Sequence, residues 1–276
     1  MRRNSLLASC LFGALLTSGA AFAQNKPPAA AKGPGPKSQA EAQAVNAVIQ
    51  AQAQSPDDMI KAVDALVSKY SDTVYKSFAL ELEAEAWQKK GDNAKAIVFA
   101  EQALQVDPKN YDAATLLANI TAATTRDTDL DKEEKLTRAE KYAHDALDIL
   151  EKDGKPALFA NVPDDQWAKT KAAGEAMAYQ ALGQVATVRK KNDDAIAAYQ
   201  KGVEVSPDPL MMIRLGRALA AAKRYDEAVS WDEKVMNSDA PAQYKSFAQA
   251  DRVRAIQAKG GPAPAPGAAP AAPAAK

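Results

Sequence analysis

The sequence predicts an all-α protein built from antiparallel helix pairs that stack one after another. Three observations support this fold class. Apolar residues recur at three- and four-residue spacing through the middle of the chain, proline is almost absent inside these runs, and similar residues return 33 positions later. Aromatic residues make up only 6% of the 276 residues, and a core rich in alanine, leucine and valine favours closely packed helices over a sheet sandwich.

Residues 1–23 are expected to be a signal peptide. Arg2-Arg3 is positively charged, residues 6–16 are mostly apolar, and Ala21-Phe22-Ala23 matches a small-x-small cleavage signal. We therefore expect cleavage after Ala23 and a mature protein in the periplasm or outside the cell, with no stable membrane insertion. Two alternatives remain open. One is a transmembrane anchor, for which the apolar run is shorter than the ~20 residues that a span needs. The other is a lipid anchor on Cys10.

Both flanks of the expected helical region have the composition of linkers. Residues 24–37 contain proline, glycine, alanine and lysine but no large apolar side chain, which is typical of a flexible linker. Residues 260–276 (GGPAPAPGAAPAAPAAK) are rich in alanine and proline and are expected to be a disordered tail. The helical repeat domain is therefore expected over residues 38–259, with residues 241–259 as a capping helix.

The charge balance and the cysteine content exclude some classes of partner. Lysine plus arginine number 35 and aspartate plus glutamate also number 35, so the formal net charge is zero. A neutral chain has no bulk electrostatic attraction to nucleic acid or to anionic membranes, and we expect neither as a partner. Cys10 is the only cysteine, so the mature chain would have no thiol chemistry.

Breaks in the helical periodicity set the boundaries of the expected helices. Each break contains proline, glycine or a cluster of polar residues, which end helices or form turns. The ten breaks fall at residues 55–56, 70–72, 90–91, 107–108, 124–131, 153–163, 190–192, 206–209, 223–224 and 239–241.

A repeat is visible in the second half of the chain. Leu182-Gly183 returns as Leu215-Gly216, and Ala195 returns as Ala228, both 33 residues later. We expect each glycine to face the alanine of its own helix pair, so that the two helix axes can approach closely. In residues 91–110, the alanines at positions 96, 100 and 103 are expected to serve the same close packing, and another copy is expected around residues 139–146.

These segments carry a family resemblance. GDNAKAIVFAEQALQVDPKN (residues 91–110) resembles the second helix of a tetratricopeptide repeat (TPR). AYQALGQVATVRKKNDDAIAAYQKGVEVSPDP (residues 178–209) resembles a whole repeat, and RLGRALAAAKRYDEAVSWDEKVM (residues 214–236) another copy. The resemblance covers residues 77–240, whereas residues 38–73 fit only weakly. It implies an α-solenoid, a right-handed superhelical stack of antiparallel helix pairs.

The same resemblance implies a binding groove on the concave face, lined by the first helix of each pair, in which a peptide or a partner helix lies. The family's best-known groove holds a terminal carboxylate, but only Asn119 and Arg217 resemble its residue set, and Glu81 and Glu85 oppose it. We expect an oriented partner of mixed charge instead. The candidate groove residues are Phe78, Glu81, Glu85, Thr115, Asn119, Met177, Gln180, Gln184, Ile213 and Arg217.

No set of residues in the sequence indicates catalysis or a metal site. His144 is the only histidine, so neither a zinc site nor a serine triad has a complete set. Residues 127–131 (DTDLD) resemble the start of a calcium loop, but Lys132 and Arg138 stand where glycine and glutamate are required. A hydrolase built on Asp164-Asp165 is conceivable, although nothing in the sequence pairs with them. We expect no enzyme, no catalytic residue, no metal and no cofactor.

The leading interpretation is therefore an exported scaffold that binds a protein or peptide partner, whose identity the sequence does not indicate. The alternative is a structural component of a cell-envelope or cell-wall assembly that uses its alanine- and proline-rich tail. Residues 153–163 include Leu158, Phe159 and Val162, and this loop is expected to plug one end of the stack or to meet a partner.

Overall fold

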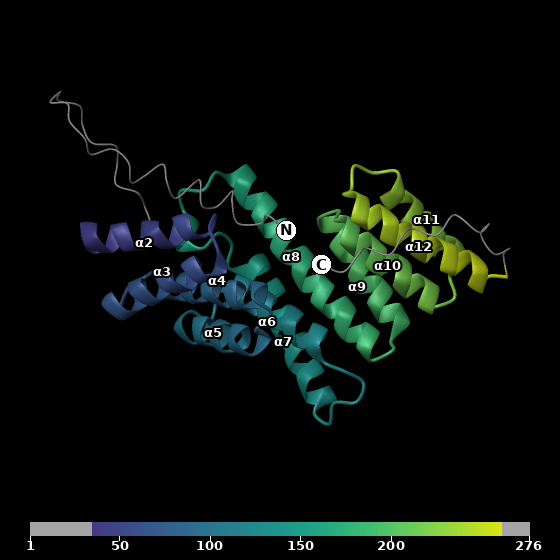
Figure 1. Ribbon diagram of the computed structural model, residues 1–276, viewed down its shortest axis with the longest axis horizontal. Coiled ribbons are helices and arrows are strands. Elements are labelled where there is room, and N and C mark those ends of the chain that lie inside the picture. Colours follow the sequence, from purple (N-terminus) through teal and green to yellow (C-terminus); the bar gives the residue numbers. More distant parts are fainter. Residues whose placement is uncertain (1–34, 261–276) are drawn as a thin grey trace. The chain divides into compact units, whose positions relative to one another are not determined.

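Figure 1 shows the computed structural model of the chain, which describes residues 35–260. Every regular element in that range is a helix, which confirms the all-α prediction, and each predicted break coincides with a boundary between two helices. The predicted signal peptide and most of the predicted linker and tail lie outside the described residues. The elements are α2 (Gln39–Ala51), α3 (Pro56–Lys69), α4 (Lys76–Lys89), α5 (Asn93–Val106), α6 (Tyr111–Thr124), α7 (Lys132–Lys152), the 3₁₀ turn η1 (Ala157–Phe159), α8 (Asp164–Val188), α9 (Asn192–Val205), α10 (Pro209–Ala221), α11 (Tyr225–Met236) and α12 (Ala242–Ala258).

The described chain forms two compact units. Unit 1 comprises residues 35–120 and 141–174, and unit 2 comprises residues 121–140 and 175–260. Within each unit, helices that follow one another in the sequence pack against one another: α2 to α5 do so in unit 1, and α9 to α12 in unit 2. This sequential pairing is the arrangement of an α-solenoid, in which each helix pair buries its apolar face against its neighbours.

Side-chain caps explain where several helices begin. Ser38, Ser55 and Asp92 each accept a hydrogen bond from a backbone N–H in the first turn of α2, α3 and α5. Asp208 accepts two such bonds at the start of α10, and Pro209 occupies the first position of that helix. These residues satisfy N–H groups that have no partner inside the helix, and proline at this position loses no hydrogen bond.

The turns inside three helix pairs share one backbone feature. Gly91, between α4 and α5, has a φ of 80°, Lys190, between α8 and α9, has a φ of 61°, and Lys223, between α10 and α11, has a φ of 63°. This left-handed conformation ends a helix and starts the return, and it is uncommon for residues other than glycine. Its occurrence at Lys190 and again 33 residues later at Lys223 repeats the period seen in the sequence.

The small residues of the repeats are buried, as the sequence predicts. Ala96, Ala100 and Ala103 of α5 have no exposed surface, and Ala195 and Ala228 are each 1% exposed. In unit 1, Ala96 and Ala100 pack with Ala84 of α4 and with the larger side chains of α6. The methyl groups of α5 therefore allow close contact with helices on both sides.

The predicted glycine contacts are correct for one pair and need correction for the other. A Cβ atom added to Gly216 would lie 3.6 Å from the carbonyl oxygen of Ala228, as expected. A Cβ atom added to Gly183 would instead meet the ring of Tyr199, 2.6 Å from its Cδ1 atom. The close approach at Gly183 thus makes room for an aromatic ring one turn further along α9, and not for the predicted Ala195.

Candidate functional site

The ten predicted groove residues differ in their accessibility. Glu81, Thr115 and Asn119 are buried, and Ile213 has no exposed surface because it packs with Val235 and its neighbours in the core of unit 2. These four side chains are covered by the chain itself, so in this structure they do not form an open surface. Half-buried positions are taken by Phe78, Glu85, Met177, Gln180 and Gln184, and Arg217 is exposed.

Phe78 is covered by the loop that precedes α8. The ring of Phe159 packs edge-on against the ring of Phe78, with 6.2 Å between the ring centroids and 82° between the planes. Leu158 packs against the core formed by α2, α3 and α4, and Val162 is buried. The apolar residues of this loop therefore pack inside unit 1.

Arg217 lines a charged hollow in unit 2, which we call the Asp232 hollow. Its volume is about 250 Å³. It lies among α10, α11 and α12, which pack against one another and are seen side by side in Figure 1. The lining residues are Gly216, Arg217, Ala220, Tyr225, Asp232, Asp251, Arg254, Ala255 and Ala258.

Asp251 of α12 holds two arginines at the edge of this hollow. The Nε of Arg217 donates a hydrogen bond to Oδ2 of Asp251 over 2.6 Å, and Nη1 of Arg254 donates to Oδ1. The side chain of Asp251 is only 7% exposed, whereas those of Arg217 and Arg254 are 52% and 69% exposed. One buried carboxylate thus orients two accessible guanidinium groups toward the same hollow, and charge-assisted bonds of this kind are among the stronger hydrogen bonds of proteins.

Asp232 of α11 is the most unusual residue of the hollow. It is 1% exposed, and its Oδ1 atom has no hydrogen-bond partner within residues 35–260. Burial raises the pKa of Asp232 to about 7, and the nearby charge of Asp251 acts in the same direction, against the arginines at 217, 252 and 254. An unsatisfied buried polar group costs about 1–3 kcal/mol and is rare in folded proteins, so this carboxyl group is a candidate contact for a ligand.

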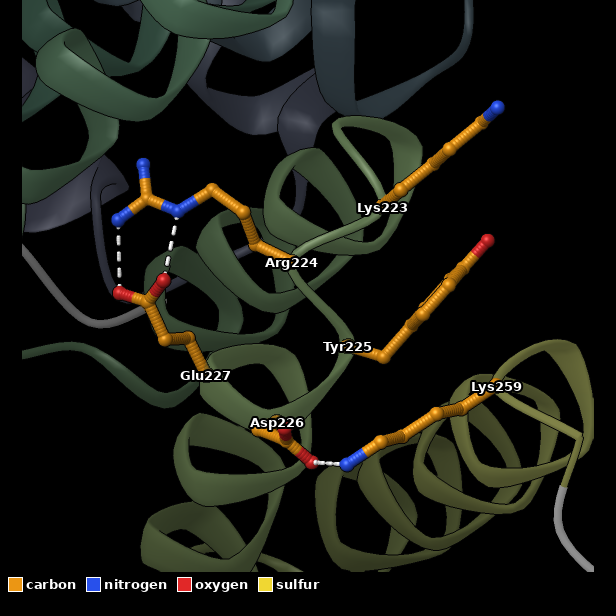
Figure 2. Close-up of a pocket in the computed structure, with 6 residues that line it drawn as sticks. All are labelled: Lys223, Arg224, Tyr225, Asp226, Glu227 and Lys259. Carbon is orange, nitrogen blue, oxygen red and sulfur yellow. Dashed lines mark hydrogen bonds and ion pairs between the residues drawn. The ribbon is translucent and has the colours of Figure 1, made fainter.

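A second hollow adjoins the first, and we call it the Lys259 hollow. Its volume is about 170 Å³. Figure 2 shows Arg224 paired with Glu227 through two hydrogen bonds of 2.6 and 2.7 Å, and Asp226 paired with Lys259. Exposed ion pairs of this kind contribute little to stability. The hollow is lined by Lys223, Arg224, Tyr225, Asp226, Glu227 and Lys259.

Tyr225 lines both hollows. In Figure 2 the side chains of Lys223 and Tyr225 extend side by side away from the turn between α10 and α11. The two hollows together present cations and anions around one aromatic ring. This arrangement can bind a group of mixed charge.

Sequence reasoning finds Arg217 but misses the aspartates at 232 and 251, Tyr225 and Arg254. A signal for Asp232 is present in the sequence. It lies four residues after the buried Ala228 and three before the buried Val235, so its position on the helix is one that faces the core. Charged residues are rarely fully buried unless they are paired, so an aspartate at such a position is unusual. The residues of α12 carry no such signal, because only the fold brings them to α10.

Metal and membrane sites are absent from the part of the chain that the structure describes. Within residues 35–260, no group of three or more His, Cys, Asp or Glu side chains is placed to hold a metal ion. In the same range no helix is both long enough and apolar enough to cross a membrane. The predictions on metal, cofactor and membrane insertion stay predictions.

Comparison with solved structures identifies the fold. A thermophilic TPR protein of Thermus thermophilus matches with a TM-score of 0.50 and 17% sequence identity, over 79% of this chain and 98% of that chain. The assembly chaperone of RpL4, Acl4, matches over the same shares with 12% identity and a TM-score of 0.36. No protein-family model matches the chain. No curated protein matches it either. The fold is thus a TPR-like α-solenoid, as the sequence predicts.

Proposed function

We propose that this chain, whose fold is TPR-like, is an exported scaffold that binds a peptide or a helix of a partner protein through the first helices of its helix pairs. The observation that supports this proposal most is the sequential pairing of helices in each unit, because such arrays offer extended surfaces for binding. The expected signal peptide over residues 1–23 supports export.

The charged surface of unit 2 supports a partner of mixed charge. Arg217 lies on α10 and is the most accessible of the ten predicted groove residues. Two arginines and two aspartates lie within one hollow, and Tyr225 offers a ring beside them. Aromatic and arginine side chains are enriched among the residues that dominate protein interfaces. We therefore place the partner's contact in unit 2 on α10 and α12.

Crosslinking in the native envelope, followed by mass spectrometry, tests the proposal. We expect crosslinks from one partner to α10 and α12, and we expect Arg217→Glu to abolish them. The matched control is Lys141→Glu, which makes the same charge reversal at a side chain that is 71% exposed on α7. Thermal melting verifies that both variants are folded. Crosslinks that Arg217→Glu leaves unchanged, or that it and Lys141→Glu reduce equally, would contradict the proposed surface.

Export has its own test. Fractionation of the native cells and N-terminal sequencing of the protein are expected to recover a chain that begins at Gln24 in the periplasmic or extracellular fraction. A full-length chain in the cytoplasmic fraction would refute export. The alternative role in an envelope assembly stays a prediction, and deletion of residues 260–276 tests it, because that role requires localisation to be lost while partner binding persists.

A further inference from the structure

The Asp232 hollow exists because an aspartate stands where the preceding repeat has an aromatic residue. Tyr199 of α9 and Asp232 of α11 occupy equivalent positions 33 residues apart, and so do Gly183 and Gly216 opposite them. In the first repeat the ring of Tyr199 fills the space beside Gly183. In the second repeat the atom nearest to a Cβ added on Gly216 is Oδ1 of Asp232, 3.2 Å away. The smaller side chain leaves a hollow and places a carboxyl group in its lining.

The two arginines of the hollow retain donors for a ligand. Arg217 and Arg254 each bond to Asp251 through one nitrogen, and their other guanidinium nitrogens have no acceptor within the described chain. Because both side chains are more than half exposed, these donors face solvent at the edge of the hollow. A pair of guanidinium groups fixed in this way is suited to a carboxylate.

The buried carboxyl group of Asp232 is suited to a hydrogen-bond donor or a cation, and not to a carboxylate. Its Oδ1 atom accepts no hydrogen bond from any described residue, so a ligand that brings an N–H donor would supply the missing partner. A purely anionic ligand would leave Asp232 unsatisfied and would be repelled by it once it is ionised. A purely cationic ligand would be repelled by the two arginines. Only a ligand that carries both groups is complementary to the whole hollow.

We propose that the Asp232 hollow binds a free α-amino acid with an apolar side chain, whose ammonium group contacts Asp232 and whose carboxylate contacts Arg217 and Arg254. The hollow, at about 250 Å³, is smaller than the roughly 300–1,000 Å³ typical of sites for drug-sized ligands, so it suits a single small molecule. The remaining wall is apolar, formed by Tyr225 and the alanines of α10 and α12. This small-molecule site shares Arg217 and Tyr225 with the surface proposed for the protein partner.

Calorimetric titration of the full chain with singly charged analogues tests the proposal. L-leucine and L-phenylalanine carry both charges, isocaproate and hydrocinnamate lack the ammonium group, and L-leucinamide and L-phenylalaninamide lack the carboxylate. We expect each amino acid to bind about tenfold more tightly, or better, than its two analogues, because each analogue loses a charged hydrogen bond. The proposal is wrong if both amino acids bind no more tightly than their analogues, or if neither binds at millimolar concentration.

Variants connect the binding to the named residues. Asp232→Asn is expected to weaken binding of L-leucine about tenfold or more but not to weaken binding of isocaproate, because the repulsion by an ionised Asp232 is removed. Asp194→Asn is the matched control, an exposed aspartate of unit 2 on α9 that lines neither hollow, and should change neither. If Asp232→Asn does not fold, Arg217→Gln and Arg254→Gln replace it, and each should weaken binding of both L-leucine and isocaproate. Unchanged binding of L-leucine in Asp232→Asn, or in both arginine variants, overturns the assignment.

The affinity for the zwitterion L-leucine and the affinity for the anion isocaproate should depend on pH in opposite ways. Asp232 must be ionised to hold an ammonium group, and burial raises its pKa to about 7. The charged groups that face it are Arg217 from α10 and Asp251, Arg252 and Arg254 from α12. Affinity for L-leucine should therefore rise between about pH 6 and about pH 8, and affinity for isocaproate should fall. An affinity for L-leucine that falls or stays constant over this range contradicts the proposal.

Discussion

Gly183 of α8 lies directly against the ring of Tyr199 of α9. A Cβ atom added to Gly183 would be 2.6 Å from Cδ1 of that ring, closer than nonbonded carbon atoms approach in proteins. Tyr199 is buried and packs with Ala195 and Leu215 in the core of unit 2, so its ring cannot move aside freely. The helix pair α8–α9 therefore depends on the absence of a side chain at position 183.

The first prediction follows from this contact. Gly183→Ala should lower the free energy of unfolding by about 1–3 kcal/mol, the usual cost of overpacking a core, although alanine favours helix more than glycine does. Thermal or urea unfolding measures the change. In a Tyr199→Leu background the same substitution should cost less, because the two residues are in contact. An equal cost in both backgrounds would show that the ring is not the obstacle.

The second prediction concerns Ser77, which links α4 to the last turn of α5 and to the turn between α5 and α6. Its Oγ donates to the carbonyl oxygen of Ala103 over 2.8 Å and accepts from Nδ2 of Asn110 over 2.9 Å. Ser77→Ala leaves both groups without this partner and should cost about 1–3 kcal/mol in urea unfolding. Ser71→Ala, at an exposed position in the preceding turn, should cost little. Similar midpoints for the two variants would argue against this link.

These examples indicate how far the sequence predicts the structure. The helices and their boundaries are predictable because proline, glycine and the three- and four-residue periodicity act locally. The close packing at the alanines is predictable from their spacing. The partner of Gly183 is not, because position along the helix alone does not distinguish Ala195 from Tyr199 one turn later.

The functional surface is less predictable for a related reason. The family resemblance places Ile213 in a groove, but the neighbouring helices hold it in the core of unit 2. Arg217 is identified from its place on α10, whereas its partner Asp251 lies 34 residues away, in a helix that the sequence predicts only as a cap. Pairing between residues so distant in sequence depends on the packing of the whole unit, and the sequence pattern does not contain it.

The third prediction concerns Glu83 of α4. Burial raises the pKa of Glu83 to about 7, the charge of Asp64 adds to this, and the hydrogen bond that Nε1 of Trp87 donates over 3.2 Å opposes it. The folded protein therefore holds a proton that the unfolded chain, with an ordinary pKa of 4.5, releases earlier. Because the folded state binds more protons, the free energy of unfolding should fall as pH rises from about 4.5 to about 7.

The variant Glu83→Gln isolates this effect. Glutamine has the shape of the protonated acid and can still accept from Trp87, but it does not titrate. Between about pH 5 and about pH 8, its free energy of unfolding should decrease less than that of the wild type. The two decreases should differ by at most roughly 3 kcal/mol. Glu151→Gln, at an exposed position on α7, is the control. A pH dependence in Glu83→Gln as steep as in the wild type would contradict the raised pKa.

The site in unit 2 depends on Asp232, a buried carboxyl group whose Oδ1 atom has no hydrogen-bond partner within residues 35–260 and which lies beside two arginines that share Asp251. Its most direct test is a titration followed by carbon NMR of the aspartate carboxyl signals, assigned with Asp232→Asn. We predict a pKa of about 7 for Asp232, and a lower value in Asp251→Asn, because Asp251 raises the pKa through its negative charge. A pKa for Asp232 at or below its ordinary value of 3.8 would show instead that the carboxylate is solvated or paired, and would contradict the site described for unit 2.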